Sequence, residues 1–286
     1  MKLKFTKMHG CGNDYIYFDC FGGQVIDSPE ALSIKLSDRH KGIGGDGIVL
    51  ILPPDACPEG SGDFHAGMRM YNADGSEGRM CGNALRCVTK YLFDNGLAPK
   101  HMRIWTWCGV RELEVIDEDC KAVAIRADLG PAGLTPEEVP VLLPGESVIS
   151  RPVEVGGETY EITCVSMNNG HAVVFVDDVS KVDLPRIGPL FENHPIFPDR
   201  VNTEFIQVIN RNRLRMRVWE RGSGQTMACG TGASGAVVAA VLNGHCDPGT
   251  DVTVELDGGE LVINYTEDTV IMIGDCNLVF EGTVEV

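Results

Sequence analysis

The chain has 286 residues, with 41 acidic and 24 basic side chains, so its formal net charge is −17 at pH 7. That length predicts about two domains, and that charge argues against nucleic acid or an anionic membrane surface as a partner. The longest nearly unbroken apolar stretch, residues 236–242, is too short to span a bilayer, and the N-terminal segment MKLKFTKMHG lacks the apolar core of a signal peptide. We therefore expect a cytoplasmic protein.

The cysteine pattern argues against both a disulfide framework and a zinc ribbon. The 11 cysteines are odd in number, are spread from Cys11 to Cys276, and include no CxxC pair. We expect no metal, and we expect most of these cysteines to be reduced and buried as small hydrophobic residues.

Short strands dominate the predicted elements, because β-branched runs that often alternate with polar residues lie between glycine-rich turns. The predicted strands are Tyr15–Asp19, Ile48–Leu52, Met102–Trp107, Lys121–Ala127, Thr159–Val165, Ala172–Val176, Thr203–Ile209, Arg213–Val218, Val252–Glu255, Glu260–Tyr265 and Thr269–Ile273.

Helical patterns are fewer, and two of the three open with a cysteine. Ser28–Ser37 carries an early proline and a capping residue at its start. Cys81–Phe93 has one apolar stripe and is followed by Asn-Gly, which favours a helix end. Cys229–Leu242 is apolar nearly all round, which predicts a helix buried inside a domain.

These two helix starts form a weak internal repeat. Each has a Cys-Gly-[Asn/Thr] turn after several strands, and the second cysteine follows the first by 148 positions, about half the chain. The repeat predicts two similar α+β domains, each a curved, mostly antiparallel sheet around one central helix. The proline-rich stretch Asp128–Ser150 is the expected crossing between them. The alternative is a coincidence between two glycine-rich helix starts.

A cysteine at a helix N-terminus lies where the helix dipole and unpaired N–H groups favour a thiolate and lower the thiol pKa. If Cys81 and Cys229 flank one cleft, an amino acid could bind there with its α-carboxylate on the N–H groups of the following residues. One thiolate would remove the Cα proton, and the opposite thiol would protonate the other face. The N–H donors would stabilise the carbanion without a cofactor. The alternative is that both are ordinary buried thiols. The four N–H donors are Gly82, Asn83, Gly230 and Thr231.

Other polar residues could line the same cleft. Arg221 could hold a carboxylate through two hydrogen bonds, although an exposed ion pair with Glu220 is the simpler interpretation. His171 could adjust the ionisation of a nearby thiol, although a core or loop histidine is the commoner outcome. The set also includes four asparagines in loops beside strands. Asparagine is common in turns for backbone reasons alone. They are Asn13, Asn72, Asn169 and Asn202.

Taken together, these segments resemble the diaminopimelate epimerase family. The motifs occur in family order and cover nearly the whole chain. They are KMHGCGND (7–14), GIGGDG (42–47), MYNADGSE (70–77), MCGN (80–83), VNTEF (201–205), VWERG (218–222) and ACGTG (228–232). Three positions depart from the usual family pattern, with Gly170 in place of proline, Ala84 in place of glycine and Gln225 in place of glutamate.

The resemblance implies an enzyme without pyridoxal phosphate that interconverts LL- and meso-diaminopimelate in lysine and peptidoglycan-precursor biosynthesis. It implies two pseudo-symmetric domains, residues 1–129 with 275–286 and residues 130–274, with the active site in the cleft between them and a possible homodimer. Cys81 and Cys229 would be the acid/base pair, with His171 and Glu220 adjusting them. Gly82, Asn83, Gly230 and Thr231 would hold the reacting carboxylate. The distal amino-acid head would bind to Asn13, Asn72, Asn169, Asn202, Glu220 and Arg221.

Two other functions remain open from the sequence. A cofactor-independent racemase of another amino acid would keep both cysteines and change the distal contacts. A thiol redox sensor would close Cys81 and Cys229 into a disulfide, but the asparagine, glutamate and arginine set has no purpose there. Zinc binding is less favoured, because no ligand spacing supports it.

Overall fold

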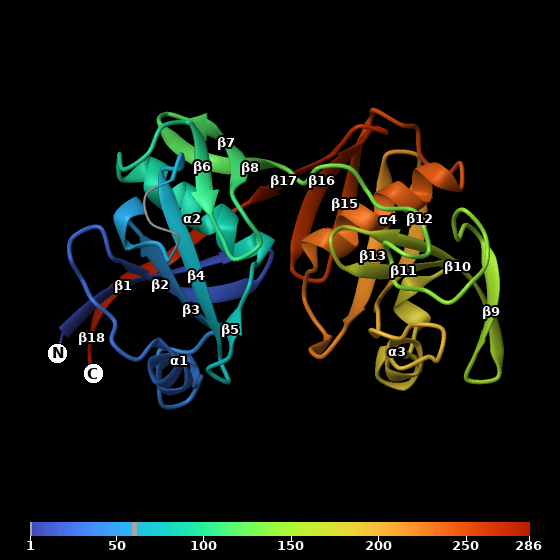
Figure 1. Ribbon diagram of the computed structural model, residues 1–286, viewed down its shortest axis with the longest axis horizontal. Coiled ribbons are helices and arrows are strands. Elements are labelled where there is room, and N and C mark those ends of the chain that lie inside the picture. The colour runs from blue at the N-terminus through green and yellow to red at the C-terminus, as the bar shows by residue number, and fades with distance from the viewer. Residues whose placement is uncertain (1, 59–61) are drawn as a thin grey trace. The chain divides into compact units, whose positions relative to one another are not determined.

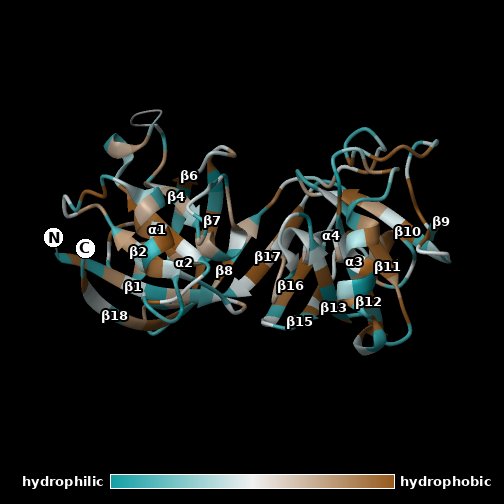
Figure 2. Cartoon of the chain, turned by 90° about the horizontal axis from the view of Figure 1, so that it is seen from below, coloured by the Kyte–Doolittle hydropathy of each residue, from teal (hydrophilic) through white to brown (hydrophobic). Residues whose placement is uncertain are grey.

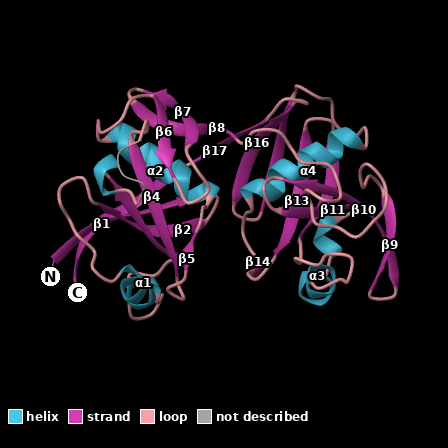
Figure 3. Cartoon of the chain, viewed as in Figure 1, coloured by secondary structure: helices cyan, strands magenta, loops and turns pink. Residues whose placement is uncertain are grey.

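The computed structural model describes residues 2–58 and 62–286, and the chain folds into two compact units (Figure 1). Unit 1 comprises Met1–Ala127 with Gly274–Val286, and unit 2 comprises Asp128–Ile273. Strands far outnumber helices in both (Figure 3), which confirms the α+β class. None of the helices in the described ranges is long and apolar enough to cross a membrane.

Unit 1 places two helices among short strands. Its elements are β1 (Lys2–Gly10), β2 (Asn13–Asp19), α1 (Pro29–Ser37), β3 (Gly47–Leu52), β4 (Ala66–Asn72), β5 (Glu77–Gly78), α2 (Gly82–Asp94), β6 (His101–Trp105), β7 (Arg111–Glu118), β8 (Lys121–Asp128) and β18 (Asn277–Glu285). A short 3₁₀ turn, Pro54–Ala56, follows β3.

Unit 2 has the same kind of composition. Its elements are β9 (Arg151–Val155), β10 (Glu158–Ser166), β11 (Gly170–Phe175), α3 (Leu184–Glu192), β12 (Asn202–Asn210), β13 (Arg213–Glu220), β14 (Gly224–Gln225), α4 (Gly230–Leu242), β15 (Asp251–Leu256), β16 (Gly259–Tyr265) and β17 (Val270–Asp275), whose last two residues belong to unit 1. A 3₁₀ turn, Val179–Lys181, precedes α3.

Strand pairing repeats between the units. In unit 1, β1–β2 is antiparallel, β2–β3 parallel, β3–β4 antiparallel, β4–β6 parallel and β6–β7 antiparallel. In unit 2, β10–β11, β11–β12, β12–β13, β13–β15 and β15–β16 follow the same alternation. The helices also correspond, since α1 and α3 precede the second strand of the parallel pair, and α2 and α4 follow the short β5 and β14. The weak sequence repeat therefore reflects two copies of one topology.

Some strands are covered on both faces, which explains why they are apolar throughout. All six residues of β3 are buried. One of its faces contributes Ile48 and Leu50 to the cluster that includes Leu32 and Leu36 of α1. Helix α2 packs against β1, β2 and β7, and α4 packs against β10, β11, β12, β15 and β16. A strand covered on both sides does not alternate between apolar and polar residues. A half-exposed strand such as β13 does alternate. Figure 2 shows such alternation as bands of hydropathy colour along strands.

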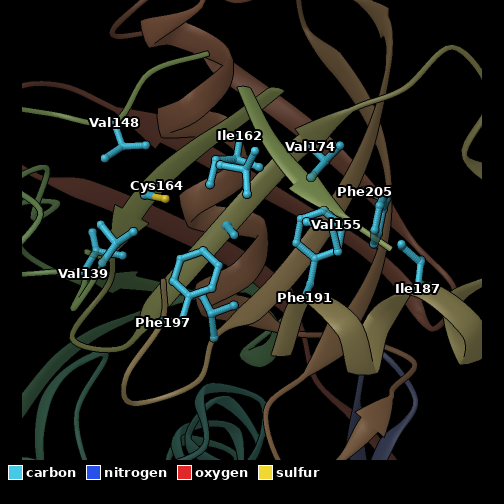
Figure 4. Packing of buried hydrophobic residues seen from close by; sticks show 14 of the residues in the cluster. Val139, Val148, Val155, Ile162, Cys164, Val174, Ile187, Phe191, Phe197 and Phe205 are labelled. Atoms are coloured by element: carbon cyan, nitrogen blue, oxygen red, sulfur yellow. The ribbon is translucent and has the colours of Figure 1, made fainter. Parts of the chain in front are cut away.

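The core beneath α3 shows how the outer helix is held on unit 2. Phe191 of α3 makes edge-to-face contacts with Tyr160 and Phe205, at centroid distances of 5.2 and 5.7 Å. Figure 4 shows Phe191 and Ile187 packed against strand residues, among them Val174 and Phe205. Burying a side chain of this size contributes roughly 1.5–3 kcal/mol. Tertiary packing therefore stabilises this helix.

The three predicted helices and all the predicted strand segments are confirmed, with ends shifted by one or two residues. Helix α3 was missed because its sequence, LPRIGPLFE, contains two prolines and a glycine, which disfavour a helix in isolation. The sequence patterns also failed to indicate the longer strands β1, β4, β7, β9 and β18. In α2 the predicted apolar stripe is buried except at half-buried Tyr91, but Arg86 and Thr89 are buried too.

Candidate active site

The two cysteines predicted to carry the chemistry occupy the same position on two matching helices. Cys81 is the N-cap of α2, with φ −138° and ψ 120°, and Cys229 is the N-cap of α4, with φ −124° and ψ 112°. Each helix has 13 residues and ends at an Asn-Gly pair. The first N–H groups of a helix lack intrahelical acceptors, so each cysteine stands beside donors suited to a carboxylate.

Cys81 is partly buried and contacts the side chain of Asn13. Its Sγ lies 3.2 Å from Asn13 Oδ1, and Asn83 Nδ2 donates to the same oxygen at 3.3 Å. Asn13 Nδ2 donates in turn to Asp46 Oδ2 at 2.7 Å. Asn13, predicted from the family to bind the distal head of a substrate, therefore also fixes the direction of the Cys81 side chain.

A buried cation lies on α2 behind this group, and the sequence analysis missed it. Arg86 is fully buried; its Nη2 donates to Asn83 Oδ1 at 2.9 Å, and its Nε donates to the Asp275 carbonyl at 3.1 Å. Asn83 is thus held between Arg86 and Asn13. The signal for Arg86 in the sequence is weak, because this residue stands between Leu85 and Cys87 but outside the predicted apolar stripe.

Cys229 is 7% exposed and caps its own helix. The Gly232 N–H donates to its Sγ at 3.3 Å, and Thr231 Oγ1 lies 3.5 Å from the same atom. Burial, with the charges of Glu220 and Glu204, nevertheless raises the pKa of the Cys229 thiol well above its ordinary value. The expectation that the helix start lowers the pKa is wrong for Cys229, because desolvation and two carboxylates outweigh the N–H donors.

A chain of polar contacts leads from a buried carboxylate to Cys229. Glu204 Oε1 lies 2.7 Å from His171 Nδ1, and both side chains are fully buried. His171 Nε2 lies 3.0 Å from Asn169 Oδ1, and Asn169 Nδ2 donates to Thr231 Oγ1 at 3.3 Å. The sequence analysis identified every member except Glu204. Its signal in the sequence is an ionisable residue directly before Phe205 and Ile206, near the start of β12.

The remaining residues predicted for unit 2 lie at the start of β12, at the end of β13 or directly after β13. Glu220 accepts a hydrogen bond from Thr226 Oγ1, and burial raises the pKa of Glu220. Asn202 is buried; its Nδ2 donates to the Gly170 carbonyl at 3.0 Å, and its Oδ1 accepts from the Arg221 N–H at 2.9 Å. Asn202 thus ties two loops together through their backbones. The Arg221 side chain is exposed and donates to the Asp199 carbonyl at 2.8 Å.

In unit 1, Asn72 ends β4 and donates to Ser76 Oγ at 3.0 Å. The predicted residues thus form two groups, one in each unit. The group around Cys81 includes Asn13, Asn83 and the backbone of Gly82. The group around Cys229 includes Asn169, His171, Glu220, Thr231 and the backbone of Gly230.

Several other cysteines behave as the sequence predicted. Desolvation raises the pKa of Cys11, Cys20 and Cys57 to about 11. It raises the pKa of the more deeply buried Cys87 and Cys164 to about 12. Within the described ranges no disulfide is formed, and no three His, Cys, Asp or Glu side chains are grouped to hold a metal ion.

Comparison with known proteins agrees with the arrangement of these motifs. The sequence profile named Diaminopimelate epimerase matches residues 5–135 and 163–279. The diaminopimelate epimerase of Acetivibrio thermocellus is 48% identical over 286 residues, covering 99% of each chain. That of Desulfovibrio desulfuricans is 50% identical, covering 98% of this chain and 97% of its own. The chain belongs to the diaminopimelate epimerase family.

Solved structures of more distant proteins share the fold of this family member. A hydroxyproline epimerase from Agrobacterium vitis superposes with a TM-score of 0.68 at 13% identity, covering 99% of this chain and 92% of its own. A phenazine biosynthesis protein of the PhzF family from Bacillus anthracis has a TM-score of 0.68 at 14% identity, with both chains fully covered. At such identities the likeness shows the fold alone, and it places this diaminopimelate epimerase family member in a fold of two similar halves.

Proposed function

We propose that this protein is a diaminopimelate epimerase, an isomerase that interconverts LL- and meso-diaminopimelate with Cys81 and Cys229 as its acid/base pair. The observation that carries the mechanism is the matched position of the two cysteines at the N-caps of two equivalent helices. Membership of the family supplies the substrate. The active site would lie in a cleft between the domains, residues 1–129 with 275–286 and residues 130–274.

The reaction requires one sulfur to be ionised and the other to be protonated. The thiolate takes the Cα proton, and the electron pair of the broken C–H bond moves into the α-carboxylate. The opposite thiol then gives its proton to the other face of Cα, which regenerates a tetrahedral carbon of inverted configuration. After the reaction the two sulfurs have exchanged protonation states, so the pair titrates as a coupled unit.

Helix-start N–H groups would stabilise the carbanion between these two steps. We assign the reacting carboxylate to the N–H groups of Gly82, Asn83, Gly230 and Thr231, because they follow the two N-caps. Donors held in place before the reaction lose little free energy to reorganisation when charge develops on the carboxylate. This stabilisation is the physical reason that the proposed reaction needs no pyridoxal phosphate.

The distal amino-acid head would bind to the polar loop residues outside the helix starts. We assign it to Asn13, Asn72, Asn169, Asn202, Glu220 and Arg221, with His171 and Glu220 also adjusting the thiols. The raised pKa of Cys229 favours Cys229 as the protonated partner before substrate binds. Asn13 and Asn169 would connect the two ends of the substrate, since each also belongs to the hydrogen-bond group of one cysteine.

Exchange of the Cα hydrogen tests this proposal directly. The purified protein is incubated in deuterated water with each diaminopimelate stereoisomer, a thiol reductant and no added cofactor. We expect one deuterium to enter at the inverted centre, together with equilibration of the LL and meso forms. A panel of other amino acids serves as the control, and faster exchange into one of them would favour a racemase of that amino acid instead.

We further propose a cytoplasmic homodimer. Reduced, largely buried cysteines suit a reducing compartment. Strand β18 pairs with β1 along its length yet leaves Leu278, Val279 and Phe280 about half exposed. Neighbouring exposed apolar side chains on one strand suit an interface with a second copy. Sedimentation velocity of the wild type and of Phe280→Glu tests this, and a monomeric wild type would contradict it.

A further inference from the structure

The repeat relates single residues of unit 2 to single residues of unit 1. One buried ionisable residue of unit 2 has an apolar counterpart in unit 1. The offset of 148 positions that relates Cys81 to Cys229 also relates Tyr71 to Trp219. Tyr71 pairs with Ile48 and Glu77 on the neighbouring strands. Trp219 pairs in the same way with Thr203 and Gln225. The next residue along each paired strand is Val49 in unit 1 and Glu204 in unit 2. A buried valine in one half therefore corresponds to a buried glutamate in the other.

The partner of Glu204 is asymmetric in the same way. His171 pairs with Asn202, the residue before Thr203, and Tyr15 pairs with Gly47, the residue before Ile48. His171 thus corresponds to Tyr15, and Asn169 corresponds to Asn13, two positions earlier in each case. Both halves keep the asparagine, but unit 1 has Val49 and Tyr15 at the two positions where unit 2 has Glu204 and His171.

The Glu204 carboxylate lies directly against the first turn of α4. A Cβ atom on Gly232 would lie 2.6 Å from Glu204 Oε1, so a larger residue there would have to displace the carboxylate. In unit 1, where Val49 takes the place of Glu204, the equivalent residue at the start of α2 is Ala84. Glu204 Oε2 is buried without a hydrogen-bond partner in the described part of the chain, so the contact with His171 Nδ1 accounts for the orientation of the carboxylate.

We propose that Glu204 is a positioning residue for Cys229, acting through His171, Asn169 and Thr231 and through its charge beneath the first turn of α4. This inference rests on the proposed function, in which Cys229 is one of the acid/base pair. By holding His171, Glu204 orients Asn169 and the Thr231 hydroxyl beside the sulfur. Its negative charge adds to burial and to the charge of Glu220 in favouring the protonated form of Cys229, so the second half of the molecule holds the thiol from which a proton is delivered.

The titratable groups around Cys229 belong to three strands. Glu204 lies on β12, Glu220 on β13 and His171 on β11. Both carboxylates raise the pKa of Cys229, while the contacts with Thr231 and Gly232 lower it. Removing the charge of Glu204 alone should therefore move the titration of Cys229 to lower pH and leave the Glu220 contribution in place.

Two substitutions separate the hydrogen bond from the charge. Glu204→Gln keeps an acceptor for His171 and removes the charge, and Glu204→Val installs the residue found in the equivalent place of unit 1.

Alkylation of Cys229 by iodoacetamide is followed from pH 6 to 11 by peptide mapping. We expect both variants to lower the midpoint of the profile and to leave its high-pH plateau unchanged. We expect inversion to fall about 10-fold in Glu204→Gln and about 100-fold in Glu204→Val.

Val174→Ala is the matched control, because Val174 lies on β11 in the cluster beneath α3, away from this chain of contacts. It should lower stability without moving the Cys229 midpoint.

The low-field resonance of the His171 Nδ1 proton gives a second readout, expected in the wild type and lost in Glu204→Val. Unchanged profiles and kinetics in both Glu204 variants, or the same midpoint shift in Val174→Ala, would overturn the inference. Failure of the wild type to epimerise diaminopimelate would instead refute the proposed function, since alkylation and the resonance require no substrate.

Discussion

The starts of α2 and α4 have similar backbones but opposite charges beneath them. At the first, the buried charge behind Cys81 is the guanidinium of Arg86, one turn further along the same helix. At the second, the buried charges near Cys229 are the carboxylates of Glu204 and Glu220, supplied by neighbouring strands. A repeated fold thus provides two similar thiol positions, and buried residues of different charge lie near them.

This difference matters because the proposed inversion by two bases needs one thiolate and one thiol at the same time. Two coupled thiols in identical surroundings would share the remaining proton equally after the first ionisation, so neither would be the preferred donor. Under the proposed mechanism, different buried charges would decide which sulfur keeps the proton. The comparison therefore predicts that substitutions at equivalent positions of the two units have unequal effects.

The largest effect should come from the cysteines themselves. Cys81→Ala and Cys229→Ala should each lower the rate of inversion about 10³- to 10⁴-fold, because each removes one proton-transfer group. Inversion is measured by chromatographic separation of LL- and meso-diaminopimelate, with circular dichroism as the check on folding. Each variant should still exchange the Cα hydrogen of one stereoisomer, and the two should prefer opposite isomers. Near wild-type inversion in either variant would rule out the mechanism.

A second comparison concerns stability at one pair of equivalent helix positions. Arg86→Met should lower the free energy of unfolding by about 3 kcal/mol, because it leaves Asn83 Oδ1 and the Asp275 carbonyl buried without this donor. Ser234 corresponds to Arg86, and its hydroxyl only donates to the Gly230 carbonyl one turn earlier. Ser234→Ala should cost about 1 kcal/mol or less. Urea denaturation measures both, and equal costs would contradict the comparison.

A third comparison uses the two equivalent asparagines. Asn13→Ala removes the acceptor that Cys81 and Asn83 share, so we expect kcat to fall about 30-fold. Asn169→Ala acts on Cys229 only through Thr231, so we expect a loss in kcat of about 10-fold. Initial rates with both stereoisomers give kcat and KM separately. A larger loss in Asn169→Ala would show that the direct contact with Cys81 is not the stronger of the two.

The last test requires no substitution. Because the pKa of Cys229 is raised above its ordinary value of 9.0, its thiolate is scarce at pH 7 and increases about tenfold for each unit of pH. Alkylation of Cys229 by iodoacetamide should rise in the same proportion between pH 7 and 9. Exposed Cys108 serves as the reference for access of the reagent. A rate for Cys229 that is independent of pH over this range would show that it is already a thiolate.

Much of the fold followed from local patterns. Periodicity and turn residues predicted α1, α2, α4 and many of the strands, although not β1 or β4, because each predicted segment is locally consistent with its final structure. Helix α3 did not follow, because Pro185, Gly188 and Pro189 disfavour a helix until Ile187 and Phe191 can pack on the sheet. Local preference and tertiary packing oppose each other in that segment.

The sequence alone determined the repeat, the two cysteines and the family, because these depend on short motifs whose residues are adjacent in the chain. Only the tertiary structure decided what surrounds each sulfur. Glu204 reaches the first turn of α4 from a strand 25 positions before Cys229, and Asn13 reaches Cys81 from 68 positions away. The ionisation of a thiol depends on the charges and the solvent within a few ångströms of it, and folding brings those groups together from distant parts of the chain.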